Sequence, residues 1–128
     1  MKITSALVLL LSLAGATLVA QDPVRSLLSK DLQGVPGKEL SMITVEYPAG
    51  GSTPAHTHHA QALLYVLEGS IVMQVKGQAP VTLSPGQTWY EGPNDVHVVS
   101  RNASNSAPAK YLVFLVKDKG APLLTPVK

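Results

Sequence analysis

Short strand-like segments separated by turn residues run through most of this chain, and they constrain its fold more than any other feature. The expected strands cover residues 40–47, 62–67, 70–76, 81–83, 87–91, 96–101 and 111–116. Most are rich in Val, Ile, Leu, Tyr or Thr and end at glycine, proline, asparagine or aspartate. No segment after residue 20 shows the 3.6-residue periodicity of an amphipathic helix. About seven short strands at this spacing predict an all-β sandwich or small barrel in a single domain.

Composition agrees with one ordinary globular domain. The chain has 128 residues, of which 45% are hydrophobic and 14% charged, with a net charge of +2. The charges are scattered without runs, so no basic stripe is available to bind nucleic acid, and we expect no nucleic-acid partner. Cysteine is absent, which excludes disulfides, thiolate ligands and cysteine nucleophiles.

The N-terminus has a different character, and residues 1–20 are typical of a secretory signal peptide. Lys2 supplies a positive charge, residues 6–13 are apolar, and small residues continue to Ala20. Cleavage after Ala20 competes with cleavage at residues 14–16. A membrane anchor or a buried helix is the alternative, but a bilayer span needs about 20 apolar residues. We therefore expect a secreted or periplasmic protein with no membrane association after cleavage.

The mature chain divides into three parts. Residues 21–39 form a polar N-terminal lead-in, residues 40–117 hold the β-barrel domain, and residues 118–128 form a C-terminal tail. The lead-in is expected to form a short helical turn or an edge strand, and to pack outside the domain or on a neighbour. Residues 24–32 and 40–47 are candidate edge-pairing segments between subunits.

Three of the four histidines fall within four consecutive positions, 56 to 59. On an extended strand His56 and His58 share one face, and His59 points the other way, to the rim of the site. His97 opens a later strand after a similar turn, and if the two strands are neighbours its imidazole completes a three-nitrogen site. Neutral imidazole suits Zn, Cu, Fe and Ni, and Mn if oxygen ligands join. We expect one divalent transition metal ion there.

Two longer motifs surround these histidines. The pattern Gly50-x5-His56-x-His58-x3-Ala62-x6-Gly69 resembles the first motif of the cupin superfamily. The pattern Gly86-x5-Gly92-x-Asn94-x2-His97 resembles the second motif. The resemblance, to small single-domain cupins, covers residues 40 to about 117. It implies a double-stranded β-helix, or jelly-roll barrel, often a homodimer, with a metal at its wide end.

The fourth metal ligand is left open by a departure from the family pattern. Ala62 stands where the family's glutamate is expected. Gln61 can offer a carbonyl oxygen, although strict alternation points it away from the site unless the strand start is distorted. Glu91 can enter the pocket as a ligand, as a hydrogen-bond partner of a ligand, or as a general base. The remaining alternative is that solvent alone fills the gap.

Arg101 is a further candidate for the pocket. It lies two steps of alternation beyond His97, so a regular strand would place both on one face. There it can bind an anionic substrate, and the alternative is a solvated strand end.

The resemblance implies an enzyme that acts on a small molecule at a mononuclear metal. Open coordination positions favour oxygen-dependent cleavage, as in a dioxygenase, or isomerisation through an enediolate. Two other classes stay open: a non-catalytic module that binds metal or a small ligand, and a degenerate cupin barrel with a structural or interaction role. Metal content separates the first two classes from the last.

Overall fold

The computed structural model describes residues 23–128, which form eleven β-strands in two sheets. The expected signal peptide, residues 1–20, lies outside the described residues. Among residues 23–128, no helix is long and apolar enough to span a membrane. The all-β prediction is confirmed, since no helix occurs in this part of the chain.

The first sheet has five strands in the order β1-β2-β10-β5-β8, all antiparallel. Their bounds are β1 Val24–Asp31, β2 Lys38–Tyr47, β10 Ala109–Asp118, β5 Gln61–Glu68 and β8 Thr88–Glu91. The second sheet has the order β11-β4-β9-β6-β7, with β3 also paired to β9. Its bounds are β11 Thr125–Pro126, β4 His56–Thr57, β9 His97–Asn102, β6 Ile71–Val75, β7 Val81–Leu83 and β3 Ser52–Thr53.

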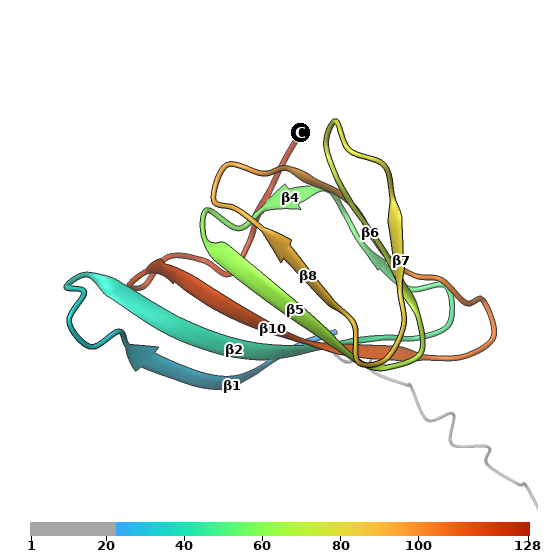
Figure 1. Cartoon of the computed structure of the whole chain (residues 1–128), viewed down its shortest axis with the longest axis horizontal. Coiled ribbons are helices and arrows are strands. Elements are labelled where there is room, and N and C mark those ends of the chain that lie inside the picture. The colour runs from blue at the N-terminus through green and yellow to red at the C-terminus, as the bar shows by residue number, and fades with distance from the viewer. Residues whose placement is uncertain (1–22) are drawn as a thin grey trace, which may run out of the picture.

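The two sheets face each other across the hydrophobic core. Figure 1 shows the long strands β1, β2, β10 and β5 lying side by side, with the shorter β4, β6 and β7 on the other side of the domain. Inward side chains come from alternate positions of each long strand, as the period of two requires. The most deeply buried are Tyr47, Val66, Ile71, Met73 and Leu115.

Four strands were not among the seven expected ones, namely β1, β3, β4 and β11. β3, β4 and β11 have two residues each and carry no period-two pattern long enough to recognise. β1 lies in the lead-in, where the helical alternative is wrong and the edge strand is found. The expectation that residues 40–47 offer a free pairing edge is also wrong, because β2 lies between β1 and β10.

The turn from β5 to β6 depends on Gly69. Its φ of +68° lies in the left-handed region, which residues with a side chain rarely adopt. A Cβ atom here would lie 2.4 Å from the carbonyl oxygen of Pro108 and 2.9 Å from the Cα of Ala109. The chain leading into β10 therefore passes so close to this turn that only glycine fits.

A β-bulge interrupts β9 next to its first residue. His97 pairs with Val75 of β6, whereas Val99 pairs with the adjacent Gln74, so Val98 is an extra residue on β9. An extra residue reverses the inside–outside alternation beyond it. Ser100, three positions after His97, is consequently buried like His97, and Arg101 is exposed.

Candidate metal centre

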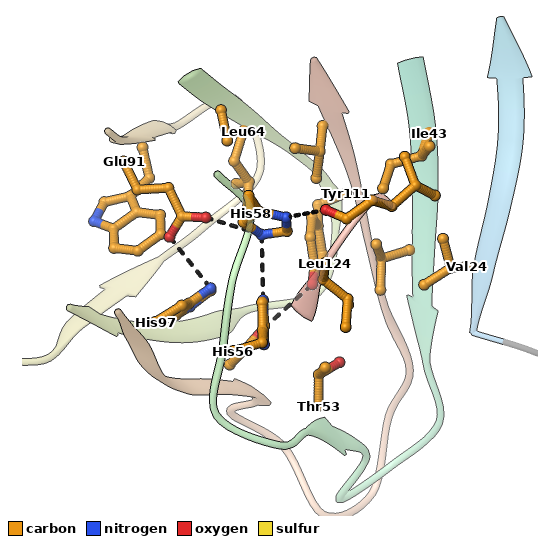
Figure 2. Close-up of a pocket in the computed structure, with 16 residues that line it drawn as sticks. Val24, Ile43, Thr53, His56, His58, Leu64, Glu91, His97, Tyr111 and Leu124 are labelled. Carbon is orange, nitrogen blue, oxygen red and sulfur yellow. Dashed lines mark hydrogen bonds and ion pairs between the residues drawn. The ribbon is translucent and has the colours of Figure 1, made fainter. Parts of the chain in front are cut away.

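His56, His58 and His97 meet at one end of the space between the sheets. His56 is the first residue of β4 and pairs directly with His97, the first residue of β9. His58 follows one residue after β4 ends. Each ring offers one nitrogen, and these three nitrogens all lie within 4.8 Å of one another. Figure 2 shows the three rings converging on a common space with Glu91 beside them.

Backbone carbonyls orient two of the rings. The Nδ1–H of His56 donates to the carbonyl of Pro54 at 2.7 Å, and the Nδ1–H of His58 donates to the carbonyl of Leu123 at 2.6 Å. A neutral imidazole that donates from Nδ1 keeps its lone pair on Nε2. The two Nε2 atoms lie 3.2 Å apart. Both rings therefore present Nε2 to the same small volume, as metal-ligating histidines do.

Glu91 brings a carboxylate to the same place. It is the last residue of β8, and its side chain is only 4% exposed. Its Oε1 lies 2.8 Å from Nε2 of His58, and its Oε2 lies 3.4 Å from Nδ1 of His97. The carboxylate thus lies between two of the three rings (Figure 2).

Unsatisfied polar atoms are concentrated here. In the described part of the chain, the buried side-chain atoms without a hydrogen-bond partner are Oε2 of Glu91 and both ring nitrogens of His97. A buried polar group without a partner costs about 1–3 kcal/mol. Unpartnered polar atoms gathered at one site indicate that the site binds an additional group, such as an ion or a ligand.

Burial sets the protonation of the histidines. It lowers the pKa of His97 to about 4 and lowers the pKa of His56. Burial also acts to lower the pKa of His58, but the hydrogen bond and negative charge of Glu91 oppose it, and the net effect raises that pKa. Near neutral pH, His56 and His97 are therefore neutral imidazoles, which is the form that binds a metal ion.

The rest of the cavity wall is largely apolar. The cavity has a volume of about 40 Å³, and a water molecule needs about 10–15 Å³ by the same measure. Trp89 lies against His97, with ring centroids 4.9 Å apart. The aliphatic side chains lining the cavity are Val24, Ile43, Val45, Ala62, Leu64, Val113, Leu123 and Leu124. The site therefore combines a compact polar end with an apolar wall that is suited to a small ligand.

Two of these wall residues come from the expected C-terminal tail. Leu123 and Leu124 line the cavity, and β11 pairs with β4, where Pro126 lies opposite His56. Val24 of β1 adds a side chain from the expected lead-in. Both flanking segments thus contribute to the site.

A cluster of buried hydroxyl groups adjoins the cavity, and the sequence analysis missed it. The Tyr47 hydroxyl lies 2.8 Å from Oγ of Ser100. The Tyr111 hydroxyl donates a hydrogen bond to the Tyr47 hydroxyl at 3.1 Å. Thr53 also bonds to Tyr47. Burial raises the pKa of Tyr111 well above its usual value, so this hydroxyl stays protonated. Alternation in 40–47 places Tyr47 on the same face as Val45, a signal that could have pointed to it.

The other candidate residues lie away from the histidines. Gln61 is exposed on the outer face of β5, where its Oε1 accepts a hydrogen bond from Tyr90 at 3.4 Å. Its neighbour Ala62 faces the cavity, so alternation holds from the start of the strand. Arg101 is turned outward by the bulge and donates to the carbonyl of Asn102. His59 is exposed, and its Nε2 lies 3.0 Å from Oγ1 of Thr57. The structure therefore brings Glu91 to the histidines, but not Gln61, Arg101 or His59.

The donor set fits a transition metal ion. Three imidazole nitrogens within 4.8 Å of one another can take adjacent positions on one ion, and neutral imidazole is a ligand for Zn, Cu, Fe and Ni. One of the two unpartnered ring nitrogens of His97 would gain a partner. This part of the chain can thus hold one metal ion.

Comparison with known proteins agrees with this description. Residues 43–115 match the family described as Cupin domain. Among proteins of curated function, none matches the chain significantly.

Three solved structures illustrate the likeness of fold. The DMSP lyase DddQ from Ruegeria pomeroyi DSS-3 is 24% identical with a TM-score of 0.65, covering 91% of this chain and 59% of that one. An oxalate oxidase in complex with the substrate analogue glycolate is 21% identical with a TM-score of 0.60, covering 69% and 46%. A cupin-like protein from Thermotoga maritima is 20% identical with a TM-score of 0.60, covering 81% and 74%. The chain thus spans about half the length of the two enzymes. At these identities the likeness concerns the fold.

Proposed function

This chain belongs to the cupin domain family, and from that premise we propose that it is an enzyme acting on a small molecule at one metal ion held by His56, His58 and His97. The observation that carries the proposal is the convergence of three histidine nitrogens within 4.8 Å inside a buried cavity. The family's double-stranded β-helix accounts for the two facing antiparallel sheets. Two proteins of similar fold, a DMSP lyase and an oxalate oxidase, are enzymes with small substrates.

The residues of this chain divide the work of such a site. Backbone carbonyls orient the rings of His56 and His58 so that both Nε2 atoms face the cavity. The Nε2 of His58 would exchange its contact with Glu91 for a bound ion. The aliphatic wall makes the cavity less polar than water, which strengthens electrostatic interactions within it. Tyr111 lines the same cavity, and its hydroxyl is held by hydrogen bonding to Tyr47.

The bound ion would supply Lewis acidity and, if redox-active, reactions with oxygen. A dioxygenase-like reaction is favoured over an isomerase-like one by analogy within the family. A second candidate is a non-catalytic module that holds metal or a small ligand. The small cavity of about 40 Å³ favours it, because there is room for the ion and only a few further atoms.

Elemental analysis of the mature protein, purified without chelator, tests the metal centre. We expect about one equivalent of a transition metal in the wild type and a large loss in His56→Ala and His97→Ala. His59→Ala is the matched control, because that ring is exposed and turned away from the site. A wild type without metal, or metal retained in both cavity variants, would contradict the proposal. Metal without oxygen uptake or turnover of phenols, diketones and sugars would favour the non-catalytic module.

The proposal includes a homodimer formed through the outer face of the five-stranded sheet. One apolar side chain from each strand forms a row across this face, which we call the outer apolar row. The pairing registers align its members: Leu28, Met42, Phe114, Leu63 and Tyr90. Leu63 and Tyr90 are each 53% exposed. An exposed apolar band of this extent is typical of a protein–protein contact, and a second copy offers an identical band.

Light scattering after size exclusion tests the dimer. We expect twice the subunit mass for the wild type and one subunit mass for Leu63→Glu, because two charges would face each other in the contact. Val81→Glu, at an exposed valine on the other sheet, is the control. A monomeric wild type would refute this part of the proposal.

The proposal also places the mature protein outside the cytoplasm. Support comes from the charged start, apolar run and small residues of positions 1–20. Cell fractionation followed by N-terminal sequencing tests it, with a mature start at Gln21 expected. An unprocessed protein in the cytoplasm would contradict it.

A further inference from the structure

The carboxylate of Glu91 and the three histidines occupy one site. Its side chain is 4% exposed, and its two oxygens lie 2.8 Å from Nε2 of His58 and 3.4 Å from Nδ1 of His97. Among residues 23–128, Glu91 is the one acidic residue that lines the cavity. Glu91 therefore supplies the negative charge that would interact with a cation bound in the cavity.

The simplest alternative is that Glu91 is present only to pair with His58. That pairing uses Oε1 alone. It leaves Oε2 of Glu91 and both nitrogens of His97 buried without hydrogen bonds. The pair with His58 thus accounts for Oε1 and leaves Oε2 without a hydrogen bond, 3.4 Å from Nδ1 of His97. A shared cation can engage atoms of both residues.

Charge gives a second reason. Three neutral imidazoles do not offset the charge of a divalent ion. The ion would keep its full charge in an apolar cavity, and burying an uncompensated charge is costly. A carboxylate in the same cavity offsets that charge, and its oxygen is also a good ligand for the harder transition metals.

From these observations we infer that Glu91 is the fourth protein ligand of the metal ion, so that the centre is His56, His58, His97 and Glu91. The inference rests on the proposed metal centre and adds an oxygen ligand to it. Ala62 is paired directly with Glu91 on the neighbouring strand and faces the same cavity. Position 62 can therefore present a carboxylate to the same volume from the neighbouring strand.

Calorimetric titration of the metal-free mature protein with Zn²⁺ tests this ligand. Glu91→Gln keeps the size of the side chain and removes its charge. We expect Zn²⁺ affinity to fall by more than about 100-fold, because loss of an outer hydrogen-bond partner costs only about 10–100-fold. The visible absorption of bound Co²⁺ should change as well, since it responds to the donor atoms. Gln61→Ala is the control, because Gln61 is exposed on the outer face of β5, and it should match the wild type in both measurements.

A transferred ligand gives a second, independent measurement. The double variant Ala62→Glu, Glu91→Ala should regain most of the Zn²⁺ affinity that Glu91→Ala loses, because position 62 lies opposite position 91. Denaturation curves of the metal-free proteins check that each variant is folded.

The outcomes separate this inference from the proposed function. Wild-type protein that binds Zn²⁺ while Glu91→Gln loses less than about 100-fold in affinity, or keeps the wild-type Co²⁺ spectrum, overturns the role of Glu91 and leaves the three-histidine centre standing. Wild-type protein that binds neither Zn²⁺ nor Co²⁺ overturns the metal centre and this ligand with it.

Discussion

Replacing Gly69 by alanine should destabilise the domain far more than replacing Gly77. Both glycines lie in turns between consecutive strands, and both have positive φ, +68° and +85°. They differ in surroundings: a Cβ at Gly69 would lie 2.4 Å from the Pro108 carbonyl oxygen, whereas nothing lies within 4 Å of a Cβ at Gly77. The pair therefore separates the cost of backbone conformation from the cost of the clash.

The magnitudes follow from these two contributions. An L-residue in the left-handed region costs about 1–2 kcal/mol, which both variants should show. The contact with Pro108 is with backbone and cannot be relieved by a rotamer change. Forcing extra volume into a packed region costs about 1–3 kcal/mol. Gly69→Ala should therefore lose about 2–5 kcal/mol of unfolding free energy, and Gly77→Ala about 1–2 kcal/mol.

Urea denaturation measures the difference through the fluorescence of Trp89, the one tryptophan in the chain. With an m-value of about 2 kcal/mol/M, the midpoint of Gly69→Ala should lie about 0.5–1.5 M below that of Gly77→Ala. Equal midpoints would show that the close approach of β10 to this turn does not limit the residue at position 69, and the reasoning would be refuted.

Three further predictions concern the site, an ion pair and the core. Because the ring of Trp89 lies 4.9 Å from that of His97, Cu²⁺ should quench its fluorescence and saturate at one equivalent; unchanged emission with bound copper would contradict a metal site at His97. Lys117 lowers the pKa of Glu39 by hydrogen bonding, so this carboxylate stabilises the fold above its usual pKa and the effect is lost as pH falls through the lowered one. The destabilisation in Glu39→Gln should thus be present at pH 7 and vanish in acid, and a pH-independent difference would refute it. Met73→Ala should cost about 2–5 kcal/mol in urea denaturation because Met73 is fully buried; exposed Val81→Ala is the control, and equal losses would contradict the assigned core.

The fold class could be read from the sequence because its signals are local. Alternating apolar residues and turn residues predict strands and their ends, and all seven expected strands are present. The spacing of His56 and His58 is also local, and it predicts that two ligands share one face. The remaining strands are too short, or too exposed, for their pattern to be recognised.

Features that depend on pairing between strands could not be read in the same way. One extra residue, Val98, moves Arg101 to the outside and Ser100 to the inside, and a bulge leaves no clear trace in a single sequence. Glu91 is one of several candidates in the sequence, which does not tell which strand lies beside residues 61–68; the register with Ala62 places Glu91 at the cavity. The group that orients His58 is the backbone carbonyl of Leu123. Every residue has such a carbonyl, so the sequence does not indicate which one is used.

The hydrogen bond from His58 to the carbonyl of Leu123 joins residues 65 positions apart. During synthesis, the chain up to residue 100 can already contain all three histidines and Glu91 while His58 still lacks the carbonyl that orients its ring. Contacts of such long range form late, since the entropy of closing the intervening loop must be overcome first. Closure by the last residues is therefore the step that completes the proposed metal site. An ion that then binds would also slow the detachment of those residues from the domain. Metal binding would therefore increase the kinetic stability of the C-terminal segment.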